Sequence, residues 1–135
     1  MNSANQRELV EAAVAARKLA VAPYSNFQVG AALVTKTGAV ITGANVESAS
    51  YGLTCCAERV ALFKALTSGH RDFTAIAVVA RTSKGPMPCG ACRQLLAEYA
   101  PGALVFVADS EAPEAVRVFT VAELLPEAFV LKNLG

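Results

Sequence analysis

The chain has 135 residues, of which 54% are hydrophobic and 17% charged, and its formal net charge is +1. This length predicts one domain, residues 1–135, whose core needs no disulfides. The near-zero charge, without any basic run, excludes a protein that neutralises many nucleic-acid phosphates. The apolar stretches are shorter than the ~20 residues of a membrane span, so we expect neither nucleic acid nor membrane as partner.

Two further features concern the compartment and the assembly. Charged side chains interrupt the apolar positions of residues 1–22, so this stretch is no signal peptide. Four cysteines in a chain without a leader indicate a reducing, cytoplasmic location, where cysteines bind metal or catalyse before they form disulfides. The charged fraction is low against the roughly 25% of ordinary domains, which favours an oligomer over a merely apolar monomer.

The amino-terminal part of the chain predicts a helix followed by a hairpin. Apolar side chains at helical spacing predict a helix over about Asn5–Ala20, which Pro23 ends. Two strands follow near Phe27–Thr35 and Ala39–Thr42. The Lys36-Thr37-Gly38 segment between them is typical of a hairpin turn.

The rest of the chain alternates helices with buried strands. A helix over about Cys55–Ser68 has Gly69 at its carboxyl end, and Phe73–Ala80 is a continuous apolar run typical of a strand buried on both faces. After a Gly- and Pro-rich loop come a helix over Gly90–Tyr99, a strand over Leu104–Ala108 and a short helix from Val121 to Leu125. This order predicts an α/β fold, a three-layer α/β/α domain with a mixed central sheet.

Three cysteines lie where loops enter the second and third helices: Cys56, Cys89 and Cys92. Helix amino termini present free N–H groups and a partial positive charge, which favour the metal-binding thiolate. The spacing of Cys89 and Cys92 lets both sulfurs reach one ion. Three ligands on a tetrahedral zinc leave the fourth position open for water, as in catalytic rather than structural sites.

Glu58 is placed to move protons at such a site. It stands two residues after Cys56, and at the first turn of a helix both side chains can project toward the ion. Zinc lowers the pKa of bound water to about 7, so a carboxylate that does not bind the metal can take the proton. Asn45 and Glu47 alternate by two, so at a strand's end they point the same way and suit the vicinal hydroxyls of a sugar, with ordinary turn chemistry as the alternative.

Other interpretations of the cysteines stay open. Cys55 or His70 could complete a structural zinc site, although adjacent side chains point apart and His70 lies ~20 Å along the helix from Cys56. A redox Cys-x-x-Cys pair needs neither a third cysteine nor a glutamate. We expect Cys55 to pack as a small apolar residue and His70 to lie at the surface or to cap the helix.

Taken together, the motifs resemble a known family. Cys56-Ala57-Glu58 and Pro88-Cys89-Gly90-Ala91-Cys92-Arg93-Gln94 resemble the zinc deaminase signature, and residues 23–32, 45–54 and 124–129 fit the small homotetrameric cytidine deaminases. The resemblance spans about residues 24–129. It implies zinc-dependent hydrolytic deamination of cytidine and deoxycytidine to uridine and deoxyuridine with release of ammonia, in pyrimidine salvage.

The resemblance also implies roles for single residues. Cys56, Cys89 and Cys92 would hold Zn²⁺, Glu58 would shuttle protons, and Arg59 would donate to the thiolates and offset their excess negative charge. The substrate would be bound by residues from several segments: Phe27 beside the pyrimidine, Asn45 and Glu47 on the ribose, Tyr51, the Ala57 backbone on the base edge, and Phe129 from a neighbouring subunit. Without the resemblance, Arg59 is a solvated helix residue, and isolated aromatics such as Phe27 and Phe129 are usually core.

Two alternatives concern the activity. A related deaminase could act on an aminonucleoside antibiotic such as blasticidin S or on a base within a nucleic acid. The Asn45-Val46-Glu47 segment favours a ribose, and the low net charge disfavours a polymer. A zinc-stabilised binding module without catalysis would need a fourth protein ligand.

Overall fold

One mixed sheet of five strands forms the centre of the protein, in a computed structural model that describes residues 3–129 and 131. The strands are β1 (Val29–Thr35), β2 (Val40–Ala44), β3 (Phe73–Ala80), β4 (Leu104–Asp109) and β5 (Ala112–Thr120), in the order β2-β1-β3-β4-β5. Of these strand pairs β3–β4 is parallel, and the others are antiparallel.

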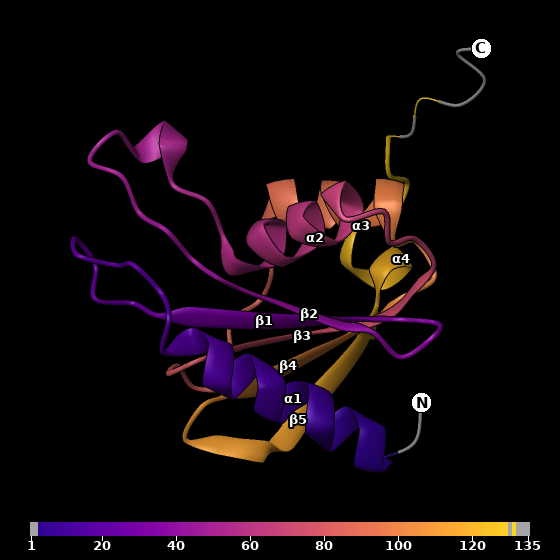
Figure 1. Cartoon of the computed structure of the whole chain (residues 1–135), viewed down its shortest axis with the longest axis horizontal. Coiled ribbons are helices and arrows are strands. Elements are labelled where there is room, and N and C mark those ends of the chain that lie inside the picture. Colours follow the sequence, from indigo (N-terminus) through magenta and orange to yellow (C-terminus); the bar gives the residue numbers. More distant parts are fainter. Residues whose placement is uncertain (1–2, 130, 132–135) are drawn as a thin grey trace.

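Helices cover both faces of the sheet and make the predicted three layers. Helix α1 (Ser3–Arg17) lies on one face, while α2 (Ala57–Thr67), α3 (Gly90–Tyr99) and α4 (Val121–Leu124) lie on the other (Figure 1). A 3₁₀ turn, η1 (Tyr51–Leu53), stands in a long loop that projects beyond the sheet between β2 and α2 (Figure 1). Among the described residues, no helix is both long and apolar enough to cross a membrane.

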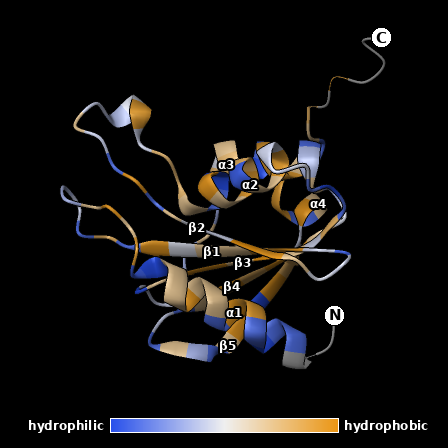
Figure 2. Cartoon of the chain, in the orientation of Figure 1, coloured by the Kyte–Doolittle hydropathy of each residue, from blue (hydrophilic) through white to orange (hydrophobic). Residues whose placement is uncertain are grey.

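The core consists of two apolar layers separated by the sheet. Ile76 and Val78 of β3 face α2 and α3, whereas Ala75, Ala77 and Val79 face α1. This alternation follows from the two-residue period of a strand, and it confirms that β3 is buried on both faces. In Figure 2 the central strands are coloured as hydrophobic, while α1 carries both kinds of residue.

The end of the first helix differs from the sequence prediction. α1 stops at Arg17, three residues short of Ala20 and well before Pro23. Val21 instead pairs with the loop after β2: its N–H donates to the Asn45 carbonyl at 2.9 Å, and its carbonyl accepts from the Glu47 N–H at 2.8 Å. The chain that follows α1 is thus paired with the loop after β2, and Pro23 lies beyond this pairing.

The edge strand β5 was not predicted from the sequence. Most of its side chains are exposed or half-buried, so it lacks the continuous apolar run that revealed β3 and β4. It contains Pro113, which is tolerated at a sheet edge but weakens a strand signal, and it also carries Glu114 and Arg117. The other edge strand, β2, receives a hydrogen bond from α2, because the Lys64 ammonium donates to the Thr42 carbonyl at 2.6 Å.

Two glycines set how closely the flanking helices approach the sheet. A Cβ on Gly43 of β2 would lie 2.5 Å from the Ala61 nitrogen and 2.6 Å from the Ala57 carbonyl oxygen of α2. A Cβ on Gly30 of β1 would lie 2.0 Å from the Ala13 carbonyl oxygen of α1. The first turn of α2 is therefore pressed directly onto the backbone of β2.

Candidate metal centre and substrate pocket

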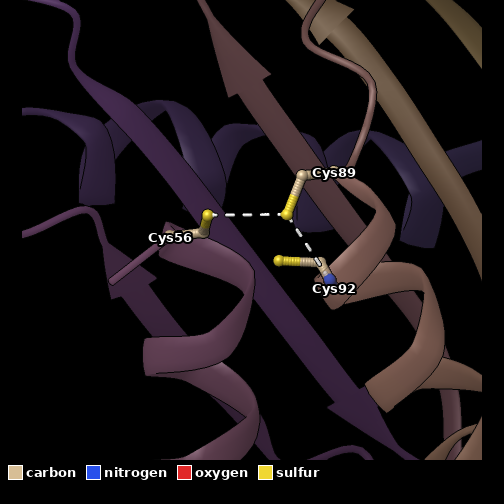
Figure 3. A group of neighbouring side chains, drawn as sticks. All are labelled: Cys56, Cys89 and Cys92. Atoms are coloured by element: carbon tan, nitrogen blue, oxygen red, sulfur yellow. Dashed lines mark hydrogen bonds between the residues drawn. The ribbon is translucent and has the colours of Figure 1, made fainter. Parts of the chain in front are cut away.

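Three thiols converge between the amino termini of α2 and α3. The sulfurs of Cys56, Cys89 and Cys92 all lie within 4.8 Å of one another and point toward a common centre (Figure 3). Cys92 is buried, Cys56 is half-buried and Cys89 is exposed, so one side of the group opens outward. The structure thus brings together the three residues that the sequence predicted as metal ligands.

Local geometry places these thiols at the helix ends. Cys56 is the N-cap of α2, and Cys89 is the N-cap of α3, where its sulfur accepts a hydrogen bond from the Cys92 N–H at 3.5 Å. A side-chain acceptor at an N-cap satisfies an otherwise unpaired helix N–H. The α2 end is held by Cys55, whose N–H donates to the Val46 carbonyl at 2.9 Å.

The donor set fits a zinc ion. With Zn–S bonds of about 2.3 Å, two sulfurs of a tetrahedral site lie about 3.8 Å apart. The Cys56 and Cys89 sulfurs are 3.8 Å apart. Thiolates are also the soft ligands that zinc accepts, and three of them leave a tetrahedral position for a non-protein ligand.

The site stabilises the thiolate of Cys56. The pKa of Cys56 falls to about 5, chiefly because its sulfur accepts a hydrogen bond from the Cys92 thiol, helped by Arg59. The pKa of Cys92 rises correspondingly, because its thiol donates to Cys56 and is buried. Metal binding requires thiolates, so a bound cation would displace the protons of these thiols.

Arg59 is the positive group of this centre. One of its terminal N–H groups donates to the Cys56 sulfur at 3.5 Å and to the Thr54 carbonyl at 3.3 Å. The hydrogen bond to Cys56 raises the pKa of the guanidinium above its ordinary value. Within the described part of the chain, its buried Nε meets no hydrogen-bond acceptor. Arg59 is thus half-buried and hydrogen-bonded to Cys56.

Glu58 lies in the first turn of α2 and is only 6% exposed. Burial raises the pKa of its carboxyl to about 7, while hydrogen bonds from its own N–H and from the Cys92 thiol act in the opposite direction. Glu58 therefore stands beside the sulfur cluster without belonging to it. A buried carboxyl of this kind can exchange a proton near neutral pH.

A pocket of about 330 Å³ lies between the segment before β1 and the loop that joins β2 to α2, and Glu47 and Tyr51 are among its lining residues. The segment Tyr24–Ser25 lines the same pocket, and so does Thr54, which accepts the Ser48 N–H. The Glu47 carboxylate accepts from the N–H groups of Tyr24 at 3.0 Å and Ser25 at 3.1 Å. Hydrogen bonds from the Ser25 hydroxyl and backbone lower the pKa of Glu47, which keeps it ionised.

Asn45 is buried and is hydrogen-bonded to the backbone of Phe27, whose own side chain is exposed. The Asn45 side chain is buried, donates to the Phe27 carbonyl at 2.9 Å and accepts the Val29 N–H at 2.8 Å. Both Asn45 and Glu47 are therefore hydrogen-bonded to the segment that leads into β1. The amide of Asn45 retains one N–H and one lone pair for a ligand.

Ala57 and Phe129, the remaining residues predicted to bind substrate, lie in different surroundings. Ala57 begins α2 directly after Cys56 and is fully buried. Phe129 is 68% exposed and is not among the lining residues of the pocket; its carbonyl accepts from the Gln94 side chain at 2.7 Å.

The alternative zinc ligands are not in the cluster. Among the described residues, the group within reach of one ion comprises Cys56, Cys89 and Cys92 alone. Cys55 is half-buried, and burial raises the pKa of its thiol. His70 stands at the far end of α2, where its N–H donates to the Ala65 carbonyl at 2.9 Å and so helps to cap the helix.

Three converging cysteine sulfurs that fit a zinc ion, with a buried carboxyl beside them, are the site of a zinc-dependent hydrolytic deaminase. Residues 3–108 match the family described as the cytidine and deoxycytidylate deaminase zinc-binding region. The chain belongs to this family.

Comparison with individual proteins supports the assignment to this family. The cytidine deaminase of Halalkalibacterium halodurans is 51% identical over 132 residues, covering 97% of this chain and 98% of its own. The crystal structure of cytidine deaminase from Burkholderia pseudomallei superposes with a TM-score of 0.88 at 52% identity, covering 96% of this chain and 100% of that one. A blasticidin-S deaminase from Bacillus cereus is 35% identical over 128 residues, with 88% of each chain covered.

Several contacts around the site were not predicted from the sequence. Ser25 and Tyr24 contact Glu47, and the signal that could have revealed them is a serine two residues before Phe27, a spacing typical of a side-chain turn. Arg93 links the loop before α3 to α4, because its guanidinium donates to the Pro88 carbonyl at 2.8 Å and the Leu124 carbonyl at 3.0 Å. No local sequence pattern predicts the contact between Arg93 and Leu124.

Proposed function

We propose that this chain catalyses the hydrolytic deamination of cytidine and deoxycytidine to uridine and deoxyuridine, with release of ammonia. The observation that carries the proposal is the buried Glu58 beside three converging thiols. The relatives named cytidine deaminase support the choice of nucleoside.

The proposed chemistry divides the work between the metal and the chain. Zinc, held by Cys56, Cys89 and Cys92, supplies the Lewis acidity that makes water a nucleophile at neutral pH. Glu58 takes a proton from the attacking water and gives it to the ring nitrogen beside the amino-bearing carbon. It then takes the second proton of that water and transfers it to the departing amine, so that ammonia leaves.

Substrate binding is proposed to use the pocket and its surroundings. Glu47 and the free amide groups of Asn45 would accept and donate to the ribose hydroxyls. The Ala57 backbone would bind the base edge, with Phe27 packing by the pyrimidine and Tyr51 at the pocket wall. A site built around sugar hydroxyls would reject a free base by leaving buried polar groups unpaired.

A substrate panel tests this proposal against its nearest alternative. Zinc-loaded protein is given cytidine, deoxycytidine, cytosine and blasticidin S, and ultraviolet absorbance follows loss of the amino group. We expect turnover of both nucleosides and little turnover of cytosine. Preferred turnover of blasticidin S would assign the chain to the activity of the Bacillus cereus relative instead.

The role of Glu58 is tested by a conservative substitution. Glu58→Gln should retain zinc and bind cytidine, yet lose about 10²–10⁴-fold in kcat, the usual contribution of a general acid–base group. The matched control is Glu114→Gln, the same change on the exposed edge strand β5, which should leave kcat unchanged. Near-normal turnover by Glu58→Gln would refute the assignment.

We further propose a cytoplasmic homotetramer that acts in pyrimidine salvage. Support for the assembly comes from large apolar side chains left exposed on the projecting loops, with Tyr51 83% and Leu53 74% exposed. Phe129 would enter the pocket of a neighbouring subunit. Light scattering should give about four times the 14.0 kDa chain mass.

Subunit mixing tests whether sites are shared. Glu58→Gln and Phe129→Ala variants are each expected to have low activity. A mixed tetramer contains some sites with Glu58 from one chain and Phe129 from another, so mixing should restore part of the activity. If mixing restores nothing although mixed tetramers form, Phe129 does not serve a neighbour.

A further inference from the structure

The Glu47 carboxylate is held by three donors from one short segment. One oxygen, Oε1, accepts the backbone N–H groups of Tyr24 and Ser25 at 3.0 and 3.1 Å. The second oxygen, Oε2, accepts the Ser25 hydroxyl. Each oxygen is thus fixed by a different kind of donor, and the hydroxyl is the only donor on Oε2 among the described residues.

The Ser25 hydroxyl has a fixed direction. Its oxygen accepts the Phe27 N–H at 3.0 Å, so its single proton is free to point at Glu47. Asn26, between the two residues, adopts a positive φ of 57°, which turns the backbone so that this short contact can form. The same hydroxyl therefore links Glu47 to the segment that carries Phe27.

This arrangement leaves Glu47 with limited capacity for a ligand. A carboxylate offers about four lone-pair sites, and three donors from the chain take three of them. The remaining site lies on Oε2, the oxygen that Ser25 orients. Without the hydroxyl, the two N–H groups would still hold Oε1, but Oε2 could swing about that anchored oxygen.

We propose that Ser25 is a positioning residue that orients Oε2 of Glu47 toward a ribose hydroxyl. The inference rests on the proposed nucleoside substrate. It goes beyond that function because it assigns a role to a side chain that need not touch the base, the metal or the reacting atoms. Ser25 is exposed, so removal of its hydroxyl leaves no buried cavity.

The test compares two substrates that differ only at the sugar. Ser25→Ala should lower kcat/KM for cytidine by about tenfold, the scale of one hydrogen bond to a charged group. It should change kcat/KM for 2′,3′-dideoxycytidine, which lacks the ring hydroxyls, by less than about twofold. Ser25→Thr keeps a hydroxyl and should restore cytidine turnover.

Two controls separate positioning from general damage. Ser50→Ala makes the same change in the neighbouring loop, where the hydroxyl does not cap η1, and should alter neither substrate. In a Glu47→Gln background, Ser25→Ala should have little additional effect, since its target carboxylate is already gone. Full additivity in this double-mutant cycle would overturn the proposal.

The outcomes also separate this inference from the proposed function. Wild-type turnover of cytidine is measured first and decides the proposed function alone. If the wild type is active, equal losses on both substrates, or no loss on cytidine, overturn the role of Ser25 only. A zinc-loaded wild type that deaminates neither nucleoside overturns both.

Discussion

Replacing Gly43 by alanine should disable the site by moving the catalytic helix. Gly43 lies on β2 under the first turn of α2, which carries Glu58 and follows Cys56. The added Cβ would stand 2.5 Å from the Ala61 nitrogen and 2.6 Å from the Ala57 carbonyl oxygen. Both are backbone atoms of a helix, so neither can rotate away.

The required movement follows from these distances. Ordinary van der Waals contact begins at 3.4 Å, so the Ala61 nitrogen must retreat by 3.4 minus 2.5 Å, about 1 Å. Misplacing catalytic groups by about 1 Å costs on the order of 10²-fold in rate. Overpacking of this kind lowers stability by about 1–3 kcal/mol. We therefore expect a stable fold with about one-hundredth of the wild-type kcat.

The assay measures kcat for cytidine and the thermal midpoint at fixed zinc concentration. Gly102→Ala is the neutral control, because a Cβ there meets nothing within 4 Å, and it should match the wild type. Gly30→Ala is the control for overpacking: its Cβ would meet the Ala13 carbonyl at 2.0 Å on α1, which carries no site residue. It should lower the midpoint more than Gly43→Ala but reduce kcat less per folded molecule.

Two results would refute this explanation. Wild-type kcat and midpoint in Gly43→Ala would mean that α2 accommodates the Cβ without moving. Equal losses of kcat in the Gly30 and Gly43 variants, each normalised to folded protein, would mean that general destabilisation rather than displacement of α2 causes the effect.

Three further predictions concern the metal centre and the carboxyl-terminal segment. Arg59→Gln should lower zinc affinity by about 10–100-fold, because the Cys56 sulfur and the Thr54 carbonyl lose their charged donor. Competition with a chromophoric chelator measures the zinc affinity, and an unchanged value would contradict this role of Arg59. Removing zinc with a chelator should lower the thermal midpoint, and added Zn²⁺ but not Mg²⁺ should restore it, since thiolates prefer the softer ion; an unmoved midpoint would show that the metal does not stabilise the fold. Gln94→Ala should raise KM several-fold at the cost of about 0.5–1.5 kcal/mol of stability, because the Phe129 carbonyl loses its 2.7 Å donor; unchanged KM together with faster hydrogen exchange around residue 129 would show that this anchor is irrelevant to binding.

Sequence patterns predicted the elements that carry a strong local signal. Phe73–Ala80 and Gly90–Tyr99 match β3 and α3 at both ends, because a continuous apolar run and a helix bounded by Cys89 and Pro101 leave few alternatives. The three ligands could be predicted for a related reason: cysteines at helix starts are rare, and each carries its own chemistry.

Features that depend on distant pairing were not predictable in this way. The chain after α1 pairs through Val21 with the loop after β2, and β5 pairs along the edge of β4. The contact between Ser25 and Glu47 joins residues 22 positions apart through a backbone turn at Asn26. The residues around either end of such a contact do not indicate which distant residue forms the other end.

The two edges of the sheet bear on how the protein avoids aggregation. An exposed edge strand offers unpaired backbone groups to any other chain, and charged side chains or proline blunt this tendency. Lys64 of α2 donates to the Thr42 carbonyl of β2, and β5 carries Pro113, Glu114 and Arg117. Strand addition is thus discouraged at both ends of the sheet. Chains that associate would meet through helices and loops, which gives closed assemblies rather than growing sheets.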